Sequence, residues 1–103
     1  MQPVLHGDVV AAARHLLCVP IKHRSGVMRR MIARADMADE FRRATLRNHR
    51  FWGDGTLEAV AVRAHLAYEP FLDDPDYCAC MMVVFQALLE RVGISRVHRK
   101  RRL

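Results

Sequence analysis

The sequence has few cysteines, few aromatic residues and no long apolar run, and each shortage argues against a class of protein. Three cysteines in 103 residues are an odd number, which argues against a disulfide framework and fits a reducing cytoplasm. Aromatic residues make up only 7% of the chain, whereas Ala, Val, Leu and Met are frequent, a mixture that favours helices. The apolar run over residues 77–89 is shorter than the ~20 residues that span a bilayer. We therefore expect an all-α, cytoplasmic protein with no membrane partner.

A chain of 103 residues is long enough for one modest core,. We expect a single helical domain over residues 1–93 and a basic C-terminal tail over residues 94–103. The N-terminus lacks the basic segment of a secretory signal, and neither Cys nor Ser stands in a nucleophile motif. A zinc site that combines His15 and Cys18 with Cys78 and Cys80 is a weak alternative, because the last two point to different sides of a helix. We expect no enzymatic activity, no cofactor and no metal.

The charged residues are arranged in blocks of opposite sign. Residues 14–50 carry ten Lys or Arg against three acids, residues 51–90 carry one against seven, and residues 91–103 carry six and no acid. Such alternation indicates a surface that faces a polyanion, together with contacts between copies or with a partner. The net charge of +6 conceals this division.

Caps, chain breakers and apolar spacing predict about four helices. Asp8 is the expected cap of the first helix, Asp54 or Thr56 that of the third, and Asp74 that of the fourth, which is expected to end at Gly93. We expect a helical bundle or hairpin that assembles into an oligomer. The expected helical ranges are about 8–18, 25–48, 56–67 and 74–92.

The second expected helix has an arginine-rich side that its three acids cannot neutralise. Phosphate contact is one interpretation, because it requires only positive charge and gives weak binding that is indifferent to sequence. A solvated charged face is the alternative. A helix-turn-helix is disfavoured, because the preceding loop and the helix itself are both too long. The expected DNA-binding residues are Arg29, Arg30, Arg34, Arg42, Arg43, Arg47 and Arg50.

Phe51 and Trp52 lie in the turn that follows. We expect both to be satellite core residues that pin the turn rather than a platform for base stacking, because aromatic side chains more often pack. The neighbouring Gly53-Asp54-Gly55 is no phosphate loop, since it lacks the Gly-Lys-Ser/Thr ending.

The fourth expected helix is apolar nearly all round, more than one small core can cover. We expect it to bury one face within the subunit and another between subunits, through Tyr77, Met81, Met82, Phe85, Leu88 and Leu89. The basic tail offers both apolar anchors and charge to a partner, although a solvated solubility tail is the alternative. Its expected partner-binding residues are Ile94, Arg96, Val97, Arg99, Lys100, Arg101 and Arg102.

Three stretches carry a resemblance to a known family: VLHGDVVAAAR at 4–14, WGDGTL at 52–57 and EPFLDDPDY at 69–77. They resemble short proteins encoded beside the large terminase of gene transfer agents, phage-like particles that package host DNA. The chain is similar to their small terminase subunit over most of residues 4–90. The resemblance implies a homo-oligomeric ring, double-stranded DNA as a partner, and a C-terminal contact with the large terminase subunit, which holds the ATPase and nuclease.

The leading hypothesis is therefore a non-enzymatic DNA-packaging adaptor that binds DNA weakly and without sequence specificity, and that recruits or stimulates the large terminase motor. The alternative is a small helical regulatory protein that binds another protein through its apolar helix and has no nucleic-acid role. Salt-dependent retention on DNA separates the two hypotheses.

Overall fold

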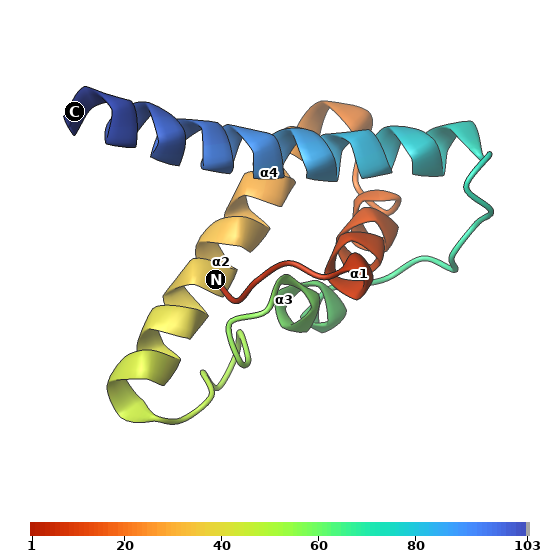
Figure 1. The fold of residues 1–103 in the computed structure, drawn as a ribbon. Helices are drawn as coiled ribbons and strands as arrows, with labels where there is room; N and C mark the ends of the chain where they lie inside the picture. Colours follow the sequence, from red (N-terminus) through yellow and green to blue (C-terminus); the bar gives the residue numbers. More distant parts are fainter. Residues whose placement is uncertain (103) are drawn as a thin grey trace.

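Four α-helices and one short 3₁₀ helix form the computed structural model, which describes the backbone of residues 1–102 and the side chains of residues 1–93 (Figure 1). Within this part of the chain there is no β-strand, only an isolated bridge between His49 and Gly53. The all-α class and the number of helices are thus confirmed. The elements are α1 (His6–Leu16), η1 (Ile21–His23), α2 (Arg24–Thr45), α3 (Leu57–Arg63) and α4 (Pro75–Arg102).

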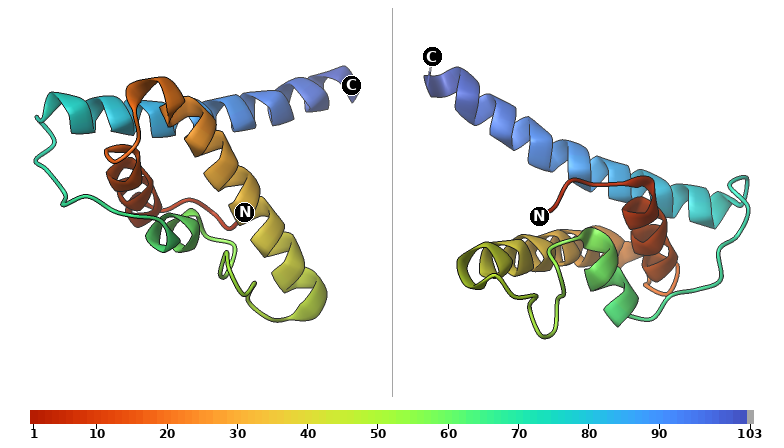
Figure 2. Two further views of the ribbon diagram at one scale, coloured as in Figure 1. Left: turned by 180° about the vertical axis from the view of Figure 1, so that it is seen from behind. Right: turned by 60° about the horizontal axis from the view of Figure 1, so that its bottom comes forward.

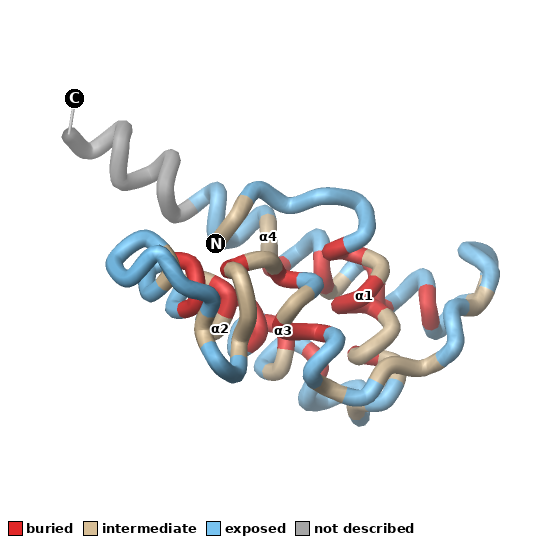
Figure 3. The backbone as a smooth tube through the Cα atoms, turned by 90° about the horizontal axis from the view of Figure 1, so that it is seen from below, coloured by how far each residue is buried: buried red, intermediate tan, exposed pale blue. Residues whose placement is uncertain are grey.

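The helices share one core in which α1 lies between α3 and α4. Both α1 and α2 pack against α3 and α4, and α2 begins beside α4 and runs away from it past α3 (Figures 1 and 2). The core takes fully buried side chains from every helix, among them Leu16, Met28, Leu57, Tyr77 and Val84. The buried segments gather where the helices meet, and the end of α2 and the connector before α4 stay exposed (Figure 3).

Asp8 was expected to be the N-cap of α1, but it lies within the first turn of the helix. The helix begins earlier, at His6, with Leu5 as its N-cap. The Asp8 Oδ2 accepts a hydrogen bond from the Leu5 amide at 2.7 Å, and its Oδ1 accepts one from the Glu58 amide at 2.8 Å. One buried carboxylate therefore satisfies free amides at the starts of both α1 and α3, which explains why the helix begins before it.

The predicted caps of α3 and α4 are confirmed. The Thr56 hydroxyl accepts from the Ala59 amide at 3.1 Å, and the Asp74 carboxylate accepts from the Tyr77 amide at 2.9 Å. The first three helices end earlier than expected: α1 ends at Leu16, α2 at Thr45 and α3 at Arg63. In α2 the break occurs at Leu46, which adopts a left-handed backbone with φ 58°.

The predicted end of α4 at Gly93 is wrong, because the helix continues to Arg102. Gly93 lacks the positive φ found at Gly53 and Gly55, so it does not form the left-handed cap that ends many helices. A glycine inside a helix costs only about 1 kcal/mol relative to alanine, which does not by itself stop a helix.

Arg24, the first residue of α2, is a buried hub that links three segments. Its Nε donates to the carbonyl oxygens of Leu16 and Val19, both at 3.0 Å, and its terminal nitrogens donate to the Asp76 carboxylate at 2.7 and 3.3 Å. The guanidinium thereby joins the end of α1, the following loop and the start of α4. It fixes where α2 begins.

Candidate nucleic-acid interface

Several of the arginines expected to bind DNA form ion pairs within the protein. Arg42 and Arg43 lie 3.1 and 3.0 Å from the Asp39 carboxylate. Asp39 is buried and also lies 3.3 Å from the Met1 ammonium. Arg42 and Arg43 therefore compensate a buried negative charge, which leaves them less free to contact phosphate than sequence alone predicts.

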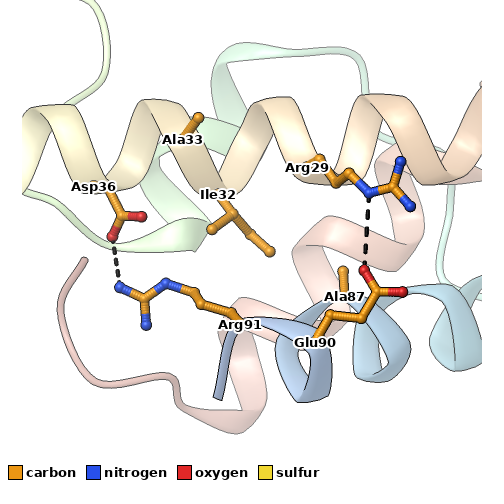
Figure 4. Close-up of a pocket in the computed structure, with 7 residues that line it drawn as sticks. All are labelled: Arg29, Ile32, Ala33, Asp36, Ala87, Glu90 and Arg91. Atoms are coloured by element: carbon orange, nitrogen blue, oxygen red, sulfur yellow. Dashed lines mark hydrogen bonds and ion pairs between the residues drawn. The ribbon is translucent and has the colours of Figure 1, made fainter. Parts of the chain in front are cut away.

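Arg29 lines a cleft of about 290 Å³ between α2 and α4 (Figure 4). Its Nε lies 3.8 Å from a Glu90 oxygen, and in the reverse direction Arg91 of α4 lies 2.8 Å from Asp36 of α2. Between these two ion pairs the cleft is lined by Ile32, Ala33 and Ala87. This side of α2 thus holds α4 in place.

The remaining predicted arginines are free of such pairs. Among the side chains that the structure describes, Arg30, Arg34, Arg47 and Arg50 have no carboxylate within 4.0 Å. Arg30 and Arg34 are one turn apart and so share a side of α2. The acids Asp36 and Asp39 face elsewhere, toward α4 and the N-terminus.

This free side of α2 continues into a second cleft, of about 410 Å³, at the start of the helix. The three ionisable residues that line it are all basic: Lys22, His23 and Arg30. Lys22 and His23 were not among the predicted site residues. They belong to η1, which was expected to be an irregular loop, and only the turn of that helix places them beside Arg30.

At its other end, the free side of α2 meets the aromatic turn. The Arg34 guanidinium lies 4.3 Å from the centroid of the Trp52 ring, on a face where a cation is attracted to the ring,. His49 stacks on the same tryptophan at 6.4 Å and 16°, and meets Phe41 edge-on at 5.2 Å. We call the whole surface the basic–aromatic face, defined by Lys22, His23, Arg30, Arg34, Phe41, His49, Arg50, Phe51 and Trp52.

The prediction for the two turn aromatics is correct for one of them. Trp52 is partly buried against the core, as expected. Phe51 is 51% exposed, so its expected role as a satellite core residue is wrong. The turn directs the two neighbouring side chains to different environments, which a sequence pattern does not reveal.

The residues predicted at an oligomer interface differ in how far a single chain buries them. Tyr77 and Met81 are buried within the single chain, and Leu88 packs partly against the same core. Tyr77 and Met81 are therefore core residues, since they face α1 and α2 rather than solvent. In contrast, Met82, Phe85 and Leu89 are 69%, 52% and 67% exposed.

The exposed apolar residues of α4 form a regular stripe, which we call the α4 stripe: Cys78, Met82, Phe85, Leu89 and Val92. Their spacing alternates between four and three residues, the repeat by which one helix packs along another. No charged residue occurs between Tyr77 and Leu89. The stripe thus offers an apolar partner a seam without any charge to desolvate.

The side chains of the predicted partner-binding residues of the tail lie outside the described residues. In the described part of the chain, no group of three His, Cys, Asp or Glu side chains is suited to a metal ion. No described helix combines the length and apolar character required to cross a membrane.

The structure is that of a small all-α protein with a basic–aromatic face and the exposed, apolar α4 stripe. The chain belongs to a family described as a domain of unknown function (DUF7742), whose model matches residues 2–88. This region contains both the basic–aromatic face and most of the α4 stripe. No curated protein and no solved structure matches the chain.

Proposed function

We propose that this protein is a non-enzymatic DNA-packaging adaptor of the small terminase kind, which binds double-stranded DNA weakly and without sequence specificity. The observation that carries the proposal is the basic–aromatic face, where cationic side chains without a carboxylate partner among the described residues lie together. Such a surface gives phosphate contact without base readout. The resemblance to small terminases of gene transfer agents supplies the biological setting, in which the adaptor recruits or stimulates the large terminase.

The DNA contact is tested by the salt dependence of binding. The variant K22Q/R30Q/R50Q removes three charges from the basic–aromatic face. If each contacts one phosphate, the slope of log K against log salt becomes shallower by about 3, because each contact contributes about 0.9. Titrations of a labelled duplex at several salt concentrations measure this slope.

A matched control is R29Q/R43Q/R63Q, which removes the same charge from two ion-paired arginines and from Arg63 at the exposed end of α3. It should change the slope much less. Equal effects of the two triple variants would mean that only net charge matters. Tight binding to one duplex but not to a scrambled one would contradict the absence of sequence specificity.

We further propose that the α4 stripe joins copies of the chain into a homo-oligomer, as a ring-forming adaptor requires. Phe85→Glu places a charge in the stripe and should reduce the assembly to the 11.9 kDa monomer without loss of helix content. Val62→Glu is the matched control, because Val62 of α3 has the same 52% exposure as Phe85. Light scattering across a concentration series measures the mass. A wild-type chain that stays monomeric throughout would refute the assembly.

The regulatory protein without a nucleic-acid role is the second candidate, and the α4 stripe is the observation that favours it, since an uncharged seam fits any apolar helix. Absence of salt-dependent DNA retention would favour this candidate. The proposed large terminase contact has its own test: removal of residues 94–103 should weaken binding to that subunit while folding is retained.

A further inference from the structure

The Phe51 ring is exposed although the turn that carries it is firmly held. The His49 Nδ1 accepts hydrogen bonds from the amides of both Phe51 and Trp52, at 3.1 Å each. The backbones of His49 and Gly53 also exchange two hydrogen bonds, at 2.8 and 3.0 Å. With 51% of its surface exposed, Phe51 adds little to the core. The turn holds an apolar ring in water at a defined position.

The other aromatic residues of this turn are already engaged. Trp52 has Arg34 over its ring at 4.3 Å and His49 stacked at 16°. Phe51 meets His49 and Trp52 only at tilted angles, 53° and 57°. Arg50 lies over the Phe51 ring at the longer distance of 5.6 Å, and Phe51 remains 51% exposed whereas His49 and Trp52 are half-buried. Of these rings, Phe51 is therefore the one with most surface left for a planar ligand.

The surroundings of Phe51 are strongly cationic. Residues 41–53 include four arginines and no acid. The Arg50 guanidinium lies 5.6 Å from the Phe51 ring centroid, and Arg47 and Arg50 have no carboxylate within 4.0 Å among the described side chains. A half-exposed aromatic ring beside a guanidinium group that has no carboxylate partner matches the chemistry that binds unpaired nucleotides, where a base stacks and its phosphates meet the cations,.

We propose that Phe51, with Arg47 and Arg50, binds an unpaired nucleotide of DNA, such as a base at an overhanging or frayed duplex end. A base within a duplex is covered on both faces by its neighbours, so only an unpaired base can stack on this ring. The site rests on the proposed DNA binding and deepens it: the cationic side chains of the basic–aromatic face contact duplex phosphates, and Phe51 distinguishes an end from the interior.

The test compares three labelled duplexes by fluorescence anisotropy at one salt concentration: a blunt duplex, the same duplex with an overhang of six thymidines, and one whose overhang has the same phosphates but abasic sugars. The thymidine overhang should bind about 5-fold or more tightly than the abasic one, since stacking of a single base contributes ~1–3 kcal/mol. Phe51→Ala should abolish this difference, whereas Phe51→Trp should retain it.

Phe71→Ala is the matched control, because Phe71 is 88% exposed in the connector before α4. It should keep the preference for the thymidine overhang. Equal binding of thymidine and abasic overhangs, or a preference that survives in Phe51→Ala, overturns the stacking site. If the wild type binds no duplex in a salt-dependent manner, the proposed function fails instead. If the wild type binds duplex DNA in a salt-dependent manner but no more tightly when the overhang is present, only the stacking site at Phe51 is overturned.

Discussion

Replacement of Arg24 by Met is expected to destabilise the protein clearly. Methionine keeps much of the aliphatic volume of arginine but donates no hydrogen bond. The Val19 carbonyl oxygen therefore loses its donor, and the Leu16 oxygen keeps only the Val19 amide, at 3.0 Å. An acceptor left unsatisfied in a buried position costs about 1–3 kcal/mol. The lost pairing with Asp76 adds little, because the Asp76 side chain is 54% exposed and water can solvate it.

Together these contributions amount to about 2 kcal/mol, compared with ~5–15 kcal/mol for the total stability of a domain of this size. The melting temperature should then fall by about 8 °C or more, since 1 kcal/mol corresponds to ~4–8 °C in a domain of about 100 residues. Urea unfolding followed by circular dichroism gives the free energy of unfolding directly.

Arg30→Met on the same helix is the control, because Arg30 is exposed, and it should change stability by less than about 0.5 kcal/mol. The double variant R24M/D76N separates the ion pair from the carbonyl contacts, since Asp76→Asn should cost little once Arg24 is gone. If Arg24→Met were within 1 kcal/mol of the wild type, the buried guanidinium would not be the link between α1, α2 and α4 that its contacts indicate.

Two further predictions concern the end of α2 at Leu46 and the loss of stability at low pH. Leu46→Gly should stabilise the protein by about 0.5–1 kcal/mol, because a left-handed residue with a Cβ costs ~1–2 kcal/mol and the greater freedom of unfolded glycine offsets part of the gain. Leu46→Ala should give no such gain. Hydrogen bonds from Arg24 and from Thr56 hold the pKa of Asp76 and of Asp54, respectively, below the ordinary 3.8. Their contribution to stability is therefore complete above that value and is lost as the pH falls through the lowered pKa values. Urea midpoints between pH 6 and 2 should follow this course, with a shallower decline for Asp76→Asn; a midpoint that does not fall below pH 4 contradicts it.

Local signals made much of the fold predictable. A cap depends on residues within one turn, so Thr56 and Asp74 could be assigned from short stretches of sequence. Apolar spacing likewise placed Met28 and Tyr77 on helices. The end of α2 was missed because Leu46 adopts a left-handed conformation that leucine rarely takes, and no local residue announces it.

The candidate site was less predictable, because long-range partners decide the fate of each charge. In the sequence, Arg24 is one more basic residue of an arginine-rich segment. In the structure it is buried and donates to acceptors that lie 5, 8 and 52 residues away along the chain. Arg29 and Asp36 find their partners in α4, 61 and 55 residues further along the chain. Charge counting found the basic surface but could not separate the arginines that hold the fold from those that remain free.

This separation bears on how a weak DNA contact could serve an adaptor. Arg30, Arg34, Arg47 and Arg50 remain without a carboxylate partner among the described side chains, so one chain offers only a few phosphate contacts and should bind DNA weakly, with an affinity that falls as the salt concentration rises. The α4 stripe is a separate surface, and the ion pairs across the α2–α4 cleft fix its orientation relative to the basic–aromatic face (Figure 4). If copies join through the stripe, each copy therefore presents its face in a fixed direction. Several weak contacts on one DNA then act together, because each later contact forms at the effective concentration set by the first. Under this proposal, Phe85→Glu should reduce DNA affinity as well as assembly, although Phe85 lies outside the basic–aromatic face.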